Sequence, residues 1–540
     1  MQRLDVLPDD ILLEIFDFYA NPSYGFKSEI ESWQTLVHVC RQWRNLVFRS
    51  PRRLNLRLLC TPRTPVRDTL DVWQALPLII DGVMTLTSST FNIITALGQS
   101  NCVCQVSLLN LVGWQLEEVL AAMQVPFPEL TDLRLHLYDK TSPVIPDSFL
   151  DGSAPRLQFF EFSGIPFTGL PNLLLSASHL VSLELSDIPH SGYISPEAIV
   201  ALISVLSSLA SLYLGFESPQ SRPDLESRSL PQSKRIILPT LDLFRFKGVT
   251  EYLEDLVTRI DTPQLDEMDI TFFNQIDFDC PRFAQFFNRT LTRRTPDQAY
   301  VQFDDSTASV KLRYRPSNVN PHDVLIDISC REPDWQLSSI EQVCNSLDPL
   351  STVQDLYIKH EYTELVWKDD AIENTLWLQL FLPFTAVIKE FARGIAATLQ
   401  ELGESGITEV LPSLQHIFVE ALEPSGPFQK DIGQFVAARR LSDHPIAISD
   451  CTNTSTSWSY NNLTVMKRVG IYSPYSLAFT FILYHSSCTR KVFRCSTRLL
   501  LTSFLLKISP SLPFSPGGDG VLIPLSFVVE LRSRSDCRLA

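Results

Sequence analysis

The chain has 540 residues, too many for one ordinary hydrophobic core, so several modules or an array of repeats are expected. Apolar residues make up 45% of it and charged residues 20%, a composition that argues against wholesale disorder. The formal net charge of -16 argues against a nucleic-acid-binding protein, because phosphate contacts require a basic face.

The first residues show no targeting signal. Asp9, Asp10 and Glu14 interrupt the apolar stretch that a secretory leader needs, and they also argue against a mitochondrial one. No run of about eighteen uncharged apolar residues occurs, so we expect no membrane span. The eleven cysteines follow no regular spacing and are interpreted as reduced thiols. We therefore predict a cytoplasmic or nuclear protein, or one found in both compartments.

Composition and periodicity divide the chain into four segments. We expect a helical domain over 1–50, a Pro-punctuated linker over 51–100, a leucine-rich region over 101–430 and an atypical, poorly ordered tail over 431–540. The last ninety residues contain ten Lys and Arg against three acids, a local charge of +7, whereas the rest of the chain carries -23. This contrast indicates a different kind of segment, or a wrongly placed exon boundary.

Two amphipathic helices are predicted in the first fifty residues. Pro8 suits a first helical turn, and the apolar residues from Ile11 to Tyr19 recur at three- and four-residue steps. A second helix is expected from Ser32, its N-cap, to Val47, and Ser50-Pro51 ends it. Periodicity alone predicts no more than a helical hairpin.

The residues of this hairpin resemble the F-box. LPDDILLEIF at 7–16 and LVHVCRQWRNLV at 36–47 follow the family pattern, which is Leu-Pro, an aliphatic helix ending in Ile-Phe, and then Val-Cys-Arg-x-Trp-Arg. The continuation after Ser50 is similar to a fungal subclass with irregular leucine-rich repeats. The connection over 20–32 is several residues longer than usual in the family, which puts the geometry of the pair in question.

In the family, the F-box binds a Skp-type adaptor that joins it to a cullin scaffold. The resemblance therefore implies that the matching residues bind such an adaptor, although Phe16 and Cys40 are also suited to holding the hairpin together. The implied adaptor-binding residues are Leu7, Pro8, Ile11, Ile15, Phe16, Val39, Cys40 and Trp43.

A strand pattern of the form L-x-x-L-x-L recurs downstream of the hairpin. Leucine-rich repeats have this pattern because alternate residues of a strand face the same side. Seven matches start at Val103, Leu130, Leu157, Leu180, Leu209, Leu241 and Leu265. Their spacings of 27, 27, 23, 29, 32 and 24 residues are close to those of such repeats. Weaker matches start at Gln298, Val353 and Leu414, and the series loosens between 271 and 350.

Helical stretches lie between these strands, over Leu111–Met123 and after Ser195-Pro196-Glu197. The predicted fold class is therefore α/β, with all-α F-box helices, a curved leucine-rich-repeat-like solenoid with a parallel sheet, and an irregular tail. An ordinary mixed α/β domain is the alternative. The strand residues between the pattern positions are expected on the binding face: Arg134, His136, Glu161, Glu184, Tyr213, Arg245 and Asp269. Most are expected to be solvated side chains, and Arg134, Tyr213 and Arg245 are the candidate target-binding residues.

The sequence shows no catalytic or nucleotide-binding motif. It lacks a phosphate-binding loop, a dinucleotide fingerprint, the metalloprotease motif H-E-x-x-H and a nucleophile elbow. Cys102 and Cys104 have no second pair nearby, which favours strand thiols over a metal site. We therefore predict no catalytic residue, no metal and no cofactor.

Two functions remain open. The first is a substrate-recognition adaptor of an SCF-type ubiquitin ligase, which binds a Skp-type adaptor through the F-box and an unidentified target protein through the repeats. It supplies proximity rather than chemistry. The second is a leucine-rich interaction scaffold that does not assemble into a ligase. An enzyme built on the repeats is the least favoured interpretation.

Overall fold

The computed structural model describes most of the first 450 residues. The chain divides into two units, Met1–Ser457 and Trp458–Ala540, and all described residues belong to the first. The described residues are 7–20, 32–51, 53–54, 56–63, 66, 70, 76–139, 143–166, 172–223, 235–274, 278, 280–290, 296–314, 322–360, 374–387, 389–392, 411–419, 436, 439 and 446–450. The predicted tail beyond 450 lies outside them.

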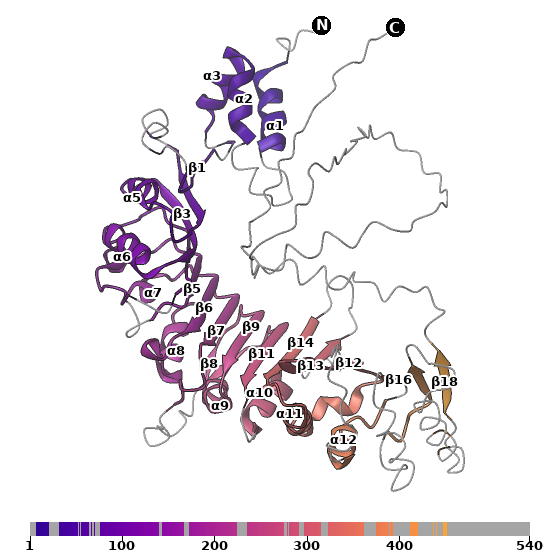
Figure 1. Cartoon of the computed structure of the whole chain (residues 1–540). Helices are drawn as coiled ribbons and strands as arrows, with labels where there is room; N and C mark the ends of the chain where they lie inside the picture. The colour runs from indigo at the N-terminus through magenta and orange to yellow at the C-terminus, as the bar shows by residue number, and fades with distance from the viewer. Residues whose placement is uncertain are drawn as a thin grey trace, which may run out of the picture. The chain divides into compact units, whose positions relative to one another are not determined.

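The fold is mixed α/β, with a large and mostly parallel sheet (Figure 1). The α-helices of the described part are α1 (Asp9–Ala20), α2 (Ser32–Val39), α3 (Arg41–Arg49), α5 (Phe91–Leu97), α6 (Gly113–Ala122), α7 (Asn172–Ser176), α8 (Pro196–Ile203), α9 (Thr250–Arg259), α10 (Pro281–Thr290), α11 (Pro333–Asn345) and α12 (Asn374–Phe381). Short 3-10 turns are η3 (Phe149–Gly152), η4 (His190–Gly192) and η5 (Asp348–Thr352).

Among the described residues, sixteen strands form the large sheet in the order β1-β2-β3-β4-β5-β6-β7-β9-β11-β14-β13-β12-β15-β16-β17-β18. They are β1 (Leu58–Cys60), β2 (Leu78–Val83), β3 (Val103–Leu111), β4 (Asp132–Leu137), β5 (Phe159–Ser163), β6 (Ser182–Ile188), β7 (Ser211–Phe216), β9 (Leu243–Gly248), β11 (Glu267–Phe273), β12 (Gln298–Phe303), β13 (Thr307–Tyr314), β14 (His322–Ser329), β15 (Asp355–His360), β16 (Lys389–Ala392), β17 (His416–Val419) and β18 (Ala447–Asp450). A separate parallel pair joins β8 (Ile236–Ile237) to β10 (Ile260–Asp261).

From β3 to β11, the strands of the sheet coincide with the strong matches of the L-x-x-L-x-L pattern. Each of the seven strong matches contains a strand, and neighbouring strands pair in parallel. The second pattern position falls in one continuous row across these strands, so that Leu133, Leu183 and Leu212 lie at equivalent registers and are fully buried. Burying each of these side chains contributes roughly 1.5–3 kcal/mol.

Helices cover this buried face. Figure 1 shows α6, α8, α9 and α11 on the same side of the sheet. The N-terminus of α8 forms as predicted, because Ser195 Oγ accepts a hydrogen bond from the Ala198 backbone N–H at 3.3 Å and Pro196 occupies the first turn. Tyr252 of α9 is also buried, and its hydroxyl donates to the Ile194 carbonyl at 2.9 Å.

The segment 271–350, where the spacing of the leucine pattern is irregular, contains a strand that is antiparallel to its neighbours. β13 pairs antiparallel with β14 on one side and with β12 on the other. β14 pairs in parallel with β11, so that β12 lies three strands away from β11 rather than beside it. This hairpin insertion explains why the repeat spacing fails between 271 and 350.

Three boundaries predicted from the sequence are corrected. The segment 51–100 is not only a linker, because it supplies β1, β2 and α5 to the fold. The predicted tail 431–540 begins too early, since β18 pairs in parallel with β17. The predicted helix over 32–47 consists of two helices, α2 and α3, which are separated at Cys40 by an extended backbone.

Candidate functional site

The helices α1 and α2 leave three large aliphatic side chains exposed. Ile11 and Ile15 retain 48% and 47% of their accessible surface, and Val39 retains 57%. Ile11 and Ile15 are four residues apart on α1, so they share one face of the helix. The adjacent Pro8 and Cys40 are also exposed. We call the pair on α1, Ile11 and Ile15, the aliphatic patch.

The opposite side of the same helices is buried in the core. Phe16 is fully buried, and its ring centroid lies 4.7 Å from that of the half-buried Trp43. Cys40 caps α3, because its Sγ accepts a hydrogen bond from the Trp43 backbone N–H at 3.5 Å. Leu7 packs partly against the core. Of the predicted adaptor-binding residues, Phe16 therefore holds the helices together, while Ile11, Ile15 and Val39 are free to meet a partner.

The segment after α3 is tied back onto α1 and α2. Arg53 forms ion pairs with Glu14 at 2.6 Å and with Asp10 at 3.7 Å. Trp33 Nε1 donates to the Arg57 carbonyl at 2.9 Å, one residue before β1 begins. The three-helix unit therefore extends past residue 50 and is anchored directly to the start of the sheet.

A row of polar side chains crosses the other face of the sheet, at registers between the buried positions. Backbone pairing aligns Arg134 with Glu161, Glu161 with Glu184, Glu184 with Tyr213, Tyr213 with Arg245 and Arg245 with Asp269. We call this row, which spans six neighbouring strands, the polar face. The structure therefore brings the three predicted target-binding residues onto one continuous surface.

The N-terminal end of the polar face is a cluster of charges. Arg134 Nε lies 3.7 Å from a Glu161 carboxylate oxygen, and His136 Nε2 lies against the other oxygen at 2.5 Å. Glu184 lies beyond them on the next strand. Burial and the neighbouring Glu161 raise the pKa of Glu184 from 4.5 to about 7, against the opposing effect of His136, Arg245 and Arg134. At neutral pH this carboxyl group is therefore only partly ionised.

The centre of the polar face is more enclosed. Arg245 is only 15% exposed and forms ion pairs with Glu267 at 3.5 Å and Asp269 at 4.0 Å. Tyr213 is half-buried, and its ring lies along its own strand over Gly215, where an added Cβ would meet the Tyr213 hydroxyl at 2.9 Å. Arg134 is therefore the most accessible of the three predicted target-binding residues.

Sequence reasoning missed the continuation of the polar face across β14, β13, β12 and β15. Lys311 of β13 forms an ion pair with Asp323 at 2.7 Å. Burial, together with Asp269 and Asp304, raises the pKa of Asp327 from 3.8 to about 7, although Lys311 opposes the shift. On β12 and β15, the rings of Tyr300 and Tyr357 stack 4.4 Å apart at an interplanar angle of 6°.

A signal for these residues was present in the sequence. In TASVKLRY, Ala308, Val310 and Leu312 alternate with polar residues, which is typical of a strand with one buried face. The leucine-repeat pattern does not detect such a strand, because it requires a particular spacing rather than simple alternation. The order of the strands, which places β13 between β14 and β12, could not be read from this alternation.

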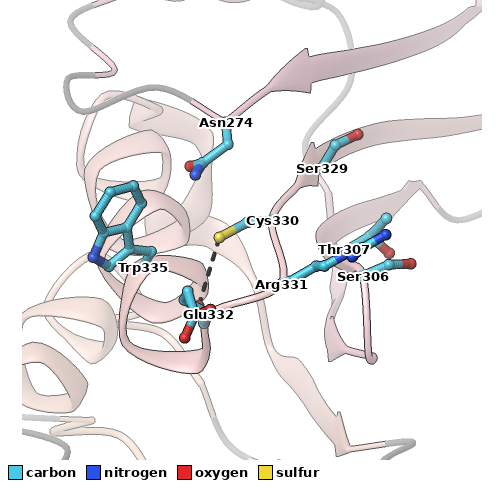
Figure 2. Close-up of a pocket in the computed structure, with 8 residues that line it drawn as sticks. All are labelled: Asn274, Ser306, Thr307, Ser329, Cys330, Arg331, Glu332 and Trp335. Carbon is cyan, nitrogen blue, oxygen red and sulfur yellow. Dashed lines mark hydrogen bonds between the residues drawn. The ribbon is translucent and has the colours of Figure 1, made fainter.

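A hollow of about 510 Å³ lies where β11 and β14 end (Figure 2). Asn274, Ser306, Thr307, Ser329, Cys330, Arg331, Glu332 and Trp335 line it. Cys330 Sγ donates to the Glu332 carbonyl at 3.5 Å, and burial raises the pKa of this thiol. A protonated, buried thiol is a poor nucleophile, so Cys330 is better suited to packing than to covalent chemistry.

The part of the chain that the structure describes also bears on metal binding and on membrane insertion. No group of three or more His, Cys, Asp or Glu side chains there is arranged to hold a metal ion. None of the described helices is both long and apolar enough to cross a membrane.

These surfaces belong to a mixed α/β protein with a large, mostly parallel sheet. Comparison with known proteins gives no family assignment, since no protein-family model matches the chain and none of the curated proteins matches its sequence.

Proposed function

We propose that this chain is a substrate-recognition adaptor of an SCF-type ubiquitin ligase. The N-terminal helices bind a Skp-type adaptor, and the polar face of a leucine-rich-repeat-like solenoid binds a target protein. The protein acts by bringing the target close to the ubiquitin-loaded enzyme rather than by catalysis, and it works in the cytoplasm, the nucleus or both.

The observation that carries this proposal is the aliphatic patch. Ile11 and Ile15 are two of the residues that match the F-box pattern, and both are about half exposed although neighbouring Leu12 and Phe16 are buried. An exposed aliphatic cluster on a folded helix costs solvation free energy unless a partner covers it. The F-box resemblance identifies that partner as a Skp-type adaptor.

The sheet supports the second half of the proposal. The L-x-x-L-x-L residues point to the buried side in register, and the intervening positions form one polar row from Arg134 to Asp269. Such a row offers many polar contacts on a rigid frame, as a target-binding surface requires.

The test is co-purification of the full chain with a Skp-type adaptor. Wild type should retain the adaptor, and Ile11→Asp combined with Ile15→Asp should reduce retention by about tenfold or more, because two charges would be buried at the interface. Both positions are exposed in the free chain, so the helices should still fold.

Val205 provides the matched control. It is 45% exposed, similar to Ile11 and Ile15, but it follows α8 and lies outside the N-terminal helices. Val205→Asp should leave adaptor retention unchanged. If wild type does not retain the adaptor, or if the double variant retains as much as wild type, the ligase proposal is wrong and the interaction scaffold is the better assignment.

A further inference from the structure

A second apolar surface lies at the carboxyl ends of three neighbouring strands, and it shares no residue with the aliphatic patch or the polar face. Leu86 follows β2, Trp114 lies in the first turn of α6 shortly after β3, and Tyr138 follows β4. Their exposed fractions are 72%, 48% and 67%. We call Leu86, Trp114 and Tyr138 the rim patch.

Backbone and side-chain hydrogen bonds hold the three segments of the rim patch together. The Tyr138 N–H donates to the Leu111 carbonyl at 2.7 Å, and the Gly113 N–H donates to Asp139 Oδ2 at 3.2 Å. These two bonds place Tyr138 beside the residues that lead into Trp114.

Gln115 connects the third segment. Its Nε2 donates to the Thr85 carbonyl at 3.0 Å and to the Ser88 carbonyl at 3.2 Å, so the turn that carries Leu86 is fixed against the start of α6. Gln115 is fully buried and its Oε1 accepts from the Val112 N–H at 3.1 Å. The three exposed side chains therefore project from a rigid base.

The surroundings of the rim patch are acidic. Glu117 and Glu118 are both exposed on α6, within one turn of Trp114. Glu117 is exposed and lies three residues after Trp114 on α6, which places both on one helix face. Asp139 directly follows Tyr138.

We propose that the rim patch binds a partner segment that is amphipathic, with apolar side chains that cover Leu86, Trp114 and Tyr138 and with basic side chains opposite the acidic surroundings. Trp and Tyr are the residue types that most often dominate binding energy at interfaces. Opposite charges around an apolar centre add specificity and speed association. This surface is separate from those of the proposed function and does not depend on the F-box.

The test uses the full chain and a fluorescein-labelled amphipathic helical peptide of leucine and lysine. Wild type should bind this peptide, and Leu86→Ser, Trp114→Ser and Tyr138→Ser together should weaken its Kd by about tenfold or more. A peptide with glutamate in place of lysine should not bind. Glu117→Lys alone should weaken binding by about threefold, and added salt should reduce that difference.

Two controls distinguish specific binding at the rim patch from non-specific peptide binding and from misfolding of the variant. Leu175→Ser with Val205→Ser removes two side chains that are each 45% exposed elsewhere, and it should leave the Kd unchanged. Replacing Leu86 with the photo-cross-linker p-benzoylphenylalanine should attach the lysine peptide to the otherwise native chain. The proposal is overturned if wild type does not bind the lysine peptide, if the triple variant binds it as wild type does, or if no cross-link forms.

Discussion

The aliphatic patch and the polar face differ in how their side chains are prepared for a partner. On α1, Ile11 and Ile15 have no polar atoms to satisfy and remain exposed. On the sheet, Arg134, Glu161 and Arg245 are already engaged in ion pairs with their neighbours. A partner that binds α1 gains binding free energy by burying apolar side chains. A partner that binds the polar face must replace existing ion pairs with new ones.

The two surfaces should respond differently to pH and to salt. Burial of aliphatic side chains does not depend on pH and changes little with salt. Partly buried carboxyl groups such as Glu184 and Asp327 titrate near neutral pH and respond to both. The two surfaces should therefore be separable by pH and by mutation.

The largest effect is expected inside the helical unit. Phe16→Ala should destabilise the unit by about 3–5 kcal/mol, because it empties a fully buried site against Trp43. Ile15→Ala, one residue earlier but 47% exposed, should change stability by less than about 0.5 kcal/mol. Hydrogen exchange of the helix amides measures the difference. Equal protection in the two variants would show that Phe16 is not a core residue.

A smaller effect is expected at Glu184. Its folded pKa of about 7 lies above its ordinary value of 4.5, so its contribution to stability is fully present below pH 4.5 and is lost as pH rises through 7. Glu184→Gln removes this loss and should make the fall in unfolding free energy between pH 5 and pH 8 smaller by about 1–3 kcal/mol.

Urea denaturation at the two pH values measures this change. Asp327→Asn should act in the same direction, since its pKa is also raised to about 7 from an ordinary 3.8. A pH dependence of the Glu184 variant equal to that of wild type would contradict the buried, charge-crowded environment described for this group.

The smallest effect is expected at Arg134. Its side chain is 46% exposed and its nearest Glu161 contact is 3.7 Å, so Arg134→Ala should alter stability by less than about 0.5 kcal/mol. In a cell, the same variant should still co-purify with the Skp-type adaptor but should retain fewer target proteins. A variant that retains an unchanged set of targets would remove Arg134 from the binding surface.

The regular part of the fold could be predicted from sequence because each strand repeats one local rule. Leu130, Leu180 and Leu209 each begin a pattern whose alternate residues must be buried, and parallel pairing of such strands follows from stacking equal units. The same alternation puts the polar positions Arg134, Tyr213 and Arg245 on one face of the sheet.

The remainder depends on relations that no local pattern contains. Cys40 ends one helix and begins the next, although the apolar period continues through it, because an extended backbone lets its Sγ cap α3. The pairing of β14 with β11 joins segments about fifty residues apart, and the polar partners of Asp327 come from other strands. These features can be identified only when the three-dimensional order of the strands is known.

The reversed strand β13 also bears on how the sheet assembles. Its turn from β12 spans only Asp304 to Ser306, and Asp304 accepts hydrogen bonds from the Ser306 and Thr307 N–H groups at 2.9 and 2.7 Å. Parallel neighbours such as β5 and β6 must instead close loops of roughly twenty residues before they pair. Because contacts of short sequence separation form fastest, the β12–β13 hairpin is expected to be among the first parts of the sheet to form.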